Sequence, residues 1–408
     1  MRVSEVASLL LASKRPLIHI GQGARHAEKE FRELIERLSL PYVTARNAND
    51  LGYDGDPCYI GRPGTFAQRG ANFAVQLCDF YLAIGTRLSL TQTGYNTKDY
   101  ARNARIVQVN IDQAELDKGT LRDPISIRAD SKDFLTELLK HIGWKCDWSV
   151  WLKRCQYLRD RYPVCLPEYK DEKGFVNSFY LVDTLSQMAS GDGVIVTDMG
   201  FAFQNTHQAW KTKKGQRLIT NCGLAPMGWG LPAAIGAAFA TQKEVILITG
   251  DGGLMMNIQE LATVMHHKLP IKIFVLNNGG YLTIKQTQEF GFEGRLMGVD
   301  KDTGLSFPTW YVIAAAHDID FQRISHHGHM DEMLRHGLRN SRPLFCEIMM
   351  SPDQPQAPRF LNRRNADGTM NPTPLEDSFP FLPEDEVAAQ MDVFGPIHKI
   401  TKTTWRYK

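Results

Sequence analysis

Residues 250–281 decide the fold of this chain, and they read GDGGLMMNIQELATVMHHKLPIKIFVLNNGGY. A glycine-rich turn opens the stretch and paired asparagines close it, and each follows an apolar strand-like run, residues 244–249 and 271–276. One helical segment joins the two runs, and such a crossover makes neighbouring strands parallel. Parallel neighbours end at the same sheet edge, ~5 Å apart. Asp251 and Asn278 are therefore expected to converge in the crevice where open α/β sheets bind ligands.

The oxygen donors at these strand ends suit a magnesium–diphosphate site. A carboxylate, an amide carbonyl and a backbone carbonyl are hard donors, and magnesium completes its shell with phosphate oxygens and water. Gly250, Gly252 and Gly253 let the backbone approach a phosphate without a Cβ clash, and the following helix offers its N-terminal amides. Each turn alone is more often an ordinary loop, but together they indicate a site. The chain contains no GxxxxGK[ST] loop.

Strand-like and helix-like segments alternate through most of the chain, which predicts two doubly wound parallel-sheet α/β domains. Further apolar runs that we predict as strands are residues 16–20, 80–84, 105–111 and 193–197. The predicted organisation is a nucleotide-binding-like central domain at 1–140, a helical linker at 141–175 that contains Trp144, a ligand-binding domain at 176–350, and an irregular C-terminal arm at 351–408.

Composition excludes several classes of protein. The 408 residues carry a net charge of +2, so no global field draws the chain to nucleic acid or to a membrane surface. No apolar run approaches the ~20 residues that span a bilayer. Residues 1–14 contain Glu5 and Lys14 and indicate a helix rather than a signal peptide. The seven cysteines show no close pairing, which favours a reducing, cytoplasmic location. The basic end, His398–Lys408, is interpreted as a solvated tail.

The stretch 250–281 resembles the thiamine diphosphate motif, in which GDG is followed by NN. The segment 225–236, APMGWGLPAAIG, is similar to the one that precedes this motif in the acetolactate synthase family. The chain also resembles segments of that family's central domain, at residues 72–76, 84–87 and 109–112 with Glu115. Residues 374–377 resemble its C-terminal arm. The resemblance covers nearly the whole chain.

What the resemblance implies is a cofactor site of thiamine diphosphate and magnesium. Asp251 and Asn278 would be side-chain ligands of the metal, and Gly280 would offer its backbone carbonyl. Met227 would lie under the cofactor and force the aminopyrimidine over the thiazolium. The residues expected to contact the cofactor are Asp198, Gly200, Ala225, Met227, Gly250, Gly252, Gly253 and Tyr281.

The chain departs from the family pattern in two respects. No segment resembles the pyrimidine-binding domain with its activating glutamate, so the catalytic residue is expected in a partner chain or in further upstream sequence. The family also has a tryptophan after the paired asparagines that helps to select the acceptor, and the ungapped position here is near Thr287. The helix that contains Thr287 is more polar, which predicts an acceptor other than a small apolar 2-oxo acid.

The central domain of acetolactate synthases holds FAD, and this chain has residues where such a nucleotide could bind: Gly21, Gly23, Gly64, Gly85, Arg87 and Asp112. The segment in place of the family's flavin-contact residues, 64–69, departs from the pattern, and relatives use this domain for other nucleotides or for none. A dinucleotide fingerprint is incomplete, because His26 stands where a third glycine is needed.

The function that these features predict is decarboxylation of a 2-oxo acid, with the product protonated or joined to an acceptor carbonyl. The expected assembly is a homo-oligomer or a complex with a pyrimidine-domain chain. Two alternatives remain open. One is a non-catalytic cofactor-binding subunit or a truncated gene product, and the other is a general Mg–nucleotide module.

Overall fold

The computed structural model describes residues 3–143, 146–364, 367 and 370–392, and it divides into two compact units. The first unit combines the chain up to Val164 with the segment from Ala357 onward, and the second spans Cys165–Gln356. Trp144 of the predicted linker and the basic residues His398–Lys408 lie outside the described residues.

The first unit is built around a six-stranded parallel sheet with the order β3-β2-β1-β4-β5-β6. Its elements are α1 (Val3–Ala12), β1 (Pro16–Ile20), η1 (Gln22–Ala27), α2 (Glu28–Leu38), β2 (Tyr42–Thr44), η2 (Arg46–Leu51), β3 (Tyr59–Gly61), α3 (Arg69–Leu77), β4 (Phe80–Ile84), α4 (Leu90–Thr93), η3 (Thr97–Asp99), β5 (Arg105–Asn110), α5 (Gln113–Asp117), β6 (Ile125–Arg128), α6 (Ser131–Lys140), α7 (Ser149–Arg161), β13 (Asn362–Arg364), β14 (Met370–Pro372) and α16 (Glu384–Met391).

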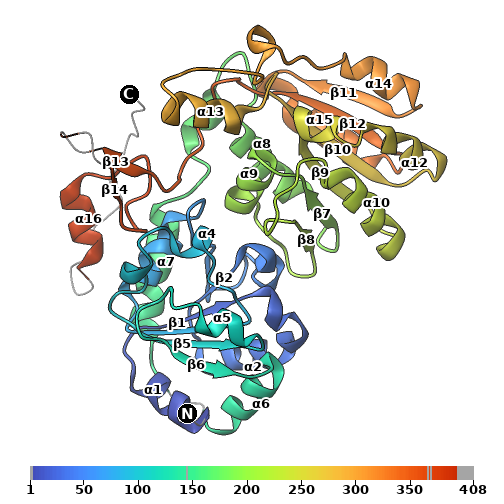
Figure 1. Ribbon diagram of the computed structural model, residues 1–408. Coiled ribbons are helices and arrows are strands. Elements are labelled where there is room, and N and C mark those ends of the chain that lie inside the picture. Colours follow the sequence, from blue (N-terminus) through green and yellow to red (C-terminus); the bar gives the residue numbers. More distant parts are fainter. Residues whose placement is uncertain (1–2, 144–145, 365–366, 368–369, 393–408) are drawn as a thin grey trace. The chain divides into compact units, whose positions relative to one another are not determined.

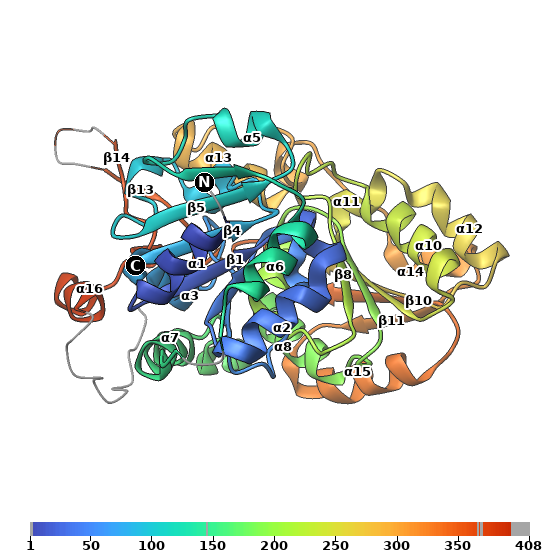
Figure 2. The same cartoon turned by 90° about the horizontal axis from the view of Figure 1, so that it is seen from below.

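Strands β1 and β4 form the centre of this sheet, and every one of their residues is buried. The chain builds β2 and β3 on one side of β1 and then returns to build β4, β5 and β6 on the other. Helix α6 packs against α1 and α2, and α3 packs against α7 (Figure 2). The carboxyl ends of β1 and β4 therefore form the point where the strand order reverses, which is where doubly wound sheets bind ligands.

The second unit is built around another six-stranded parallel sheet, with the order β11-β12-β10-β9-β7-β8 (Figure 1). Its elements are η4 (Pro167–Asp171), α8 (Ser178–Met188), β7 (Val194–Thr197), α9 (Phe201–Ala209), β8 (Arg217–Ile219), α10 (Gly230–Thr241), β9 (Val245–Gly250), α11 (Asp251–Met255), η5 (Ile258–Glu260), α12 (Leu261–His266), β10 (Ile271–Asn277), α13 (Leu282–Gly291), η6 (Lys301–Thr303), α14 (Trp310–Ala316), β11 (Asp320–Ile324), η7 (His327–His329), α15 (Met330–Arg339) and β12 (Leu344–Met349).

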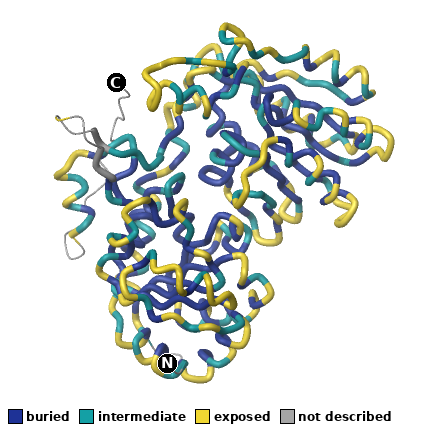
Figure 3. Tube along the Cα trace, in the orientation of Figure 1, coloured by how far each residue is buried: buried dark blue, intermediate teal, exposed yellow. Residues whose placement is uncertain are grey.

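Apolar side chains hold the helices of the second unit against its sheet. One core cluster joins α10, α12 and α14 to alternate residues of β7, β9 and β10, including Leu247 and Ile273. The residues between them in sequence, such as Ile248 and Phe274, are also buried, so these central strands are covered on both faces. Figure 3 shows the buried strands inside each unit and the exposed residues on the outer loops. The prediction of two parallel-sheet α/β domains is confirmed.

Candidate functional site

Asp251 lies at the carboxyl end of β9, beside the turn that follows β10. The two strands are neighbours, with Leu276 opposite Gly250. The Asp251 carboxylate is buried, and its Oδ2 accepts hydrogen bonds from the backbone N–H groups of Gly279 (2.8 Å) and Asn278 (3.2 Å). Its Oδ1 accepts one from Gly252 (2.7 Å). Burial raises the pKa of Asp251 to about 7, and this effect outweighs the hydrogen bonds from the backbone N–H groups, which lower the pKa. The expected convergence of Asp251 and Asn278 is thus present in the structure.

The turn 277–280 presents the other two expected metal ligands. Asn278 Oδ1 accepts a hydrogen bond from Gly280 N (3.1 Å), and Gly279 has φ +74°, a left-handed conformation that favours glycine. A Cβ on Gly280 would lie 2.2 Å from the carbonyl oxygen of Val299, so the following loop closes directly on this position. The carboxylate, amide and carbonyl oxygens of this edge are a donor set that fits magnesium.

Glycines on α11 allow close packing at the same edge. A Cβ on Gly252 would lie 2.1 Å from the Tyr281 ring and 3.4 Å from Met227 Cε. A Cβ on Gly253 would lie 2.7 Å from Asp198 Oδ2. Gly252 therefore has Tyr281 and Met227 as neighbours, and Gly253 has Asp198. A Cβ built on Gly250, by contrast, has nothing within 4 Å, so open space lies beside the backbone just before α11.

Most of the predicted cofactor residues border one pocket at this edge. Those that line it are Gly200, Met227, Gly250, Gly252, Gly253 and Tyr281, together with Asp251, Asn278 and Gly280. Asp198 and Ala225 are not among the lining residues. Ala225 is exposed with φ +52°, on the loop before Met227, and Asp198 is buried behind that loop. Direct contact of either with a cofactor stays a prediction.

Sequence reasoning missed part of the lining. The structure adds Met199, Leu276, Leu282, Thr283 and Ile284, and it also brings Phe201 and Ala202 to the pocket. Met199, Phe201 and Ala202 follow the end of β7, and residues 282–284 begin α13. The available signal was position: both segments follow strand ends at the ligand-binding edge.

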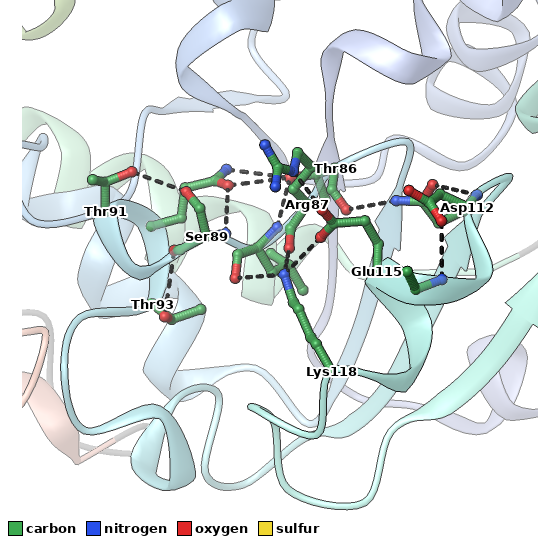
Figure 4. A network of polar contacts seen from close by, with 12 residues as sticks. Thr86, Arg87, Ser89, Thr91, Thr93, Asp112, Glu115 and Lys118 are labelled. Atoms are coloured by element: carbon green, nitrogen blue, oxygen red, sulfur yellow. Dashed lines mark hydrogen bonds and ion pairs between the residues drawn. The ribbon is translucent and has the colours of Figure 1, made fainter. Parts of the chain in front are cut away.

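The first unit gathers a second polar network at its own ligand-binding edge (Figure 4). Arg87 Nε donates to Glu115 Oε1 (2.6 Å), and Lys118 Nζ donates to Glu115 Oε2 (2.9 Å). Asp112 accepts from Ala114 N (2.9 Å) and so caps α5. Glu115 is therefore ion-paired with both Arg87 and Lys118, whereas Asp112 accepts from the backbone.

The glycines considered for FAD lie at this edge, but their amides are committed elsewhere. Gly21 N donates to the Ile84 carbonyl and Gly23 N to the Gly85 carbonyl, each at 2.9 Å. Gly64 N donates to Asn72 Oδ1 (2.8 Å), in the segment that stands in place of the family's flavin-contact residues. These three N–H groups are therefore not free to donate to a pyrophosphate, and FAD binding at this edge stays a prediction.

Comparisons with known proteins agree with this geometry. Residues 3–138 match the family model described as thiamine pyrophosphate enzyme, central domain, and residues 198–348 match thiamine pyrophosphate enzyme, C-terminal TPP binding domain. The acetolactate synthase isozyme 1 large subunit of Escherichia coli is 31% identical over 293 residues, which cover 71% of this chain and 51% of that protein. The acetolactate synthase large subunit of Cyanidium caldarium is 32% identical over 308 residues, covering 72% and 51%. Chloroplastic acetolactate synthase 2 of Nicotiana tabacum is 28% identical, covering 86% and 54%.

The fold and the two matched models define a thiamine pyrophosphate enzyme, with the predicted pocket inside the matched TPP binding domain. The chain belongs to this family and is acetolactate synthase-like. It spans about half the length of the curated relatives it matches. Within the described residues, none of the helices is long and apolar enough to cross a membrane.

Proposed function

We propose that this chain holds the diphosphate of thiamine diphosphate through magnesium, as one half of an enzyme that decarboxylates 2-oxo acids or joins them to an acceptor carbonyl. The observation that carries the proposal is the pairing of Asp251 with the turn 277–280 across two adjacent strand ends. It supports a metal site because three residues that line one pocket, Asp251, Asn278 and Gly280, offer hard oxygen donors.

The residues of the pocket have separable tasks in this proposal. Asp251, Asn278 and the Gly280 carbonyl would hold magnesium, and the glycines of α11 would admit the diphosphate. Met227, exposed by 37%, would support the cofactor ring from below. Phe201, Leu276 and Leu282 supply an apolar wall that excludes water. When bound, the cofactor supplies the electron sink for loss of CO2, and the protein supplies position and a dry site.

Magnesium-dependent binding is the direct test. In the active assembly, calorimetry should show thiamine diphosphate binding that requires Mg²⁺. Asp251→Ala should abolish this binding, because the diphosphate would lose the cation that holds it. Asp331→Ala is the matched control, since Asp331 is exposed by 54% on α15 of the same unit. Unchanged affinity in Asp251→Ala would refute the assignment. Equal affinity for ADP and thiamine diphosphate would favour the general Mg–nucleotide module instead.

The carboxylates that line the pocket bear on the alternative of a non-catalytic cofactor-binding subunit. Asp251 is the one carboxylate among the described residues that line the pocket, and it is assigned to the metal. A group that protonates the pyrimidine is therefore proposed to come from a pyrimidine-binding domain, on a partner chain or in further sequence. If no such domain acts with this chain, the chain binds the cofactor without activating it.

Segments that adjoin the pocket lining in sequence support a protein partner at this place. They carry exposed large apolar side chains: Leu224 (88%) precedes Met227, and Phe290 (62%), Phe292 (54%) and Met297 (80%) lie at or beyond the end of α13. Exposed apolar side chains are typical of an interaction surface. We propose that a pyrimidine-binding domain, from a second copy or another chain, covers these segments.

All seven cysteines are free thiols, which supports a reducing, cytoplasmic setting.

A further inference from the structure

Glu347 is a buried carboxylate on β12, outside the residues that line the pocket. Its exposed fraction is 3%. Strand β12 lies between β10 and β11, and Glu347 stands opposite Val275 on one side and Arg323 on the other. Burying a carboxylate is costly unless it is paired and hydrogen-bonded. Its partners therefore show what this position does.

The two oxygens of Glu347 have different partners. Oε1 accepts a hydrogen bond from Asn277 Nδ2 at 2.6 Å, and Oε2 accepts one from Arg323 Nε at 2.7 Å. Arg323 is half exposed, whereas Asn277 begins the turn that carries the expected metal ligands. An ionised carboxylate only accepts hydrogen bonds, so the NH2 group of Asn277 must face Glu347 and its carbonyl oxygen must face the other way.

The orientation of the Asn277 side-chain amide affects the turn 277–280, which carries the expected metal ligands. Asn277 Oδ1 accepts a hydrogen bond from Gly279 N (3.1 Å), and the same N–H also lies 2.8 Å from Asp251 Oδ2. The backbone carbonyl of Asn277 accepts from Met350 N (2.9 Å), which ties the start of the turn to the end of β12. With an inverted amide, Nδ2 would face the Gly279 N–H, and two donors would oppose each other.

We propose that Glu347 is a positioning residue for the magnesium site, acting through the amide of Asn277 on the turn that presents Asn278 and Gly280. The inference rests on the proposed function. The chain of contacts runs from Arg323 through Glu347 and Asn277 to the Gly279 amide. Outer partners of this kind orient the groups that hold a metal, and their loss typically weakens metal affinity by about 10- to 100-fold.

The experiment measures the Mg²⁺ concentration that half-saturates thiamine diphosphate binding, by calorimetry on the active assembly. Glu347→Leu should raise it by about 10- to 100-fold, as expected when an outer partner is lost. Glu347→Gln should stay close to wild type, because Oε1 of the new side chain still accepts from Asn277 while Arg323 turns to solvent. Asn277→Asp should raise the Mg²⁺ requirement, because two carboxylates then face each other. Adding Glu347→Gln to Asn277→Asp should restore binding, since a donor again meets an acceptor.

Cys346→Ala is the control for a purely structural effect. Cys346 is the buried neighbour of Glu347 on the same strand and points to the other face of the pleat. It should lower the free energy of unfolding without changing the Mg²⁺ requirement. A wild-type Mg²⁺ requirement in Glu347→Leu, or no rescue in the double variant, would overturn the positioning role alone. No magnesium-dependent binding by the wild-type assembly would overturn the proposed function, and this inference with it.

Discussion

Both carboxylate oxygens of Asp198 accept hydrogen bonds from the backbone N–H of Gly228, at 3.1 and 3.2 Å. From the other side, Asn257 Nδ2 donates to the carbonyl oxygen of Gly228 at 2.7 Å. Gly228 has φ +83°, and a Cβ there would lie 2.5 Å from Met256 Cβ. The residue after Met227 is thus held from both sides, and this fixes where the Met227 side chain enters the pocket.

Asp198→Ala should therefore weaken cofactor binding without removing a metal ligand. The N–H of Gly228 would lose its buried acceptor, which costs about 1–3 kcal/mol of unfolding free energy. Denaturant unfolding measures that loss, and calorimetry measures thiamine diphosphate affinity at saturating Mg²⁺. Asn257→Ala, on the opposite side of Gly228, should act in the same direction. Full cofactor affinity in both variants would show that the position of Met227 does not depend on the hydrogen bonds that hold Gly228.

Substrate choice is predicted from α13. Thr287 is exposed, and its Oγ1 donates to the Thr283 carbonyl at 2.9 Å, one turn away from the pocket lining. No bulky aromatic side chain occupies this position, so we expect an acceptor that is larger or more polar than pyruvate. A screen of 2-oxo acids and aldehydes with product identification is the measurement, and Thr287→Trp should shift preference towards smaller acceptors. Efficient acetolactate formation from pyruvate alone would contradict the prediction.

The activating group is predicted to come from a pyrimidine-binding domain. Hydrogen–deuterium exchange at C2 of thiamine diphosphate should be slow with the 408 residues alone and fast after that domain is added, because the carboxylate that lines the described pocket is committed to magnesium. Cofactor affinity should rise in the same step. Fast exchange and full turnover by the 408 residues alone would mean that an acid within this chain activates the cofactor.

Acid sensitivity is expected from His19, which lies at the centre of the first unit. His19 is fully buried beside the hydroxyl of Tyr81, with Gln92 Nε2 3.3 Å from its Nε2, and burial lowers its pKa to about 3. In the unfolded chain His19 binds a proton near pH 6.5, whereas in the folded chain it stays neutral until about pH 3. Its contribution to the free energy of unfolding is therefore complete above pH 6.5 and is lost as the pH falls towards 3. Between pH 7 and pH 5 the loss is about 2 kcal/mol.

The measurement compares denaturant unfolding of the wild type and His19→Gln across that pH range. Glutamine can keep a hydrogen bond to Tyr81 but does not titrate, so the variant should lose less stability on acidification. Parallel pH profiles for the two proteins would show that folding does not lower the pKa of His19.

The sequence by itself determined the central strands and the meeting of Asp251 with the turn after β10. The runs at 16–20, 80–84, 244–249 and 271–276 are mostly apolar because these strands are buried on both faces, and this composition is visible without a structure. The crossover between the last two makes them parallel, so Asp251 and Asn278 had to meet if those strands were neighbours. The strands β2, β3 and β8 were not predictable, since three residues are too few to show a periodic pattern.

Only the tertiary structure decided which distant side chains support the site. Asn277 and Glu347 are far apart in sequence, and their contact depends on the register of β10 against β12. The carboxylate of Asp198 reaches Gly228 because the loop before α10 folds back over the end of β7, so Asp198 holds the loop that carries Met227. Local sequence encodes strands, turns and ligand types, whereas these pairings arise from packing among elements that local patterns do not specify.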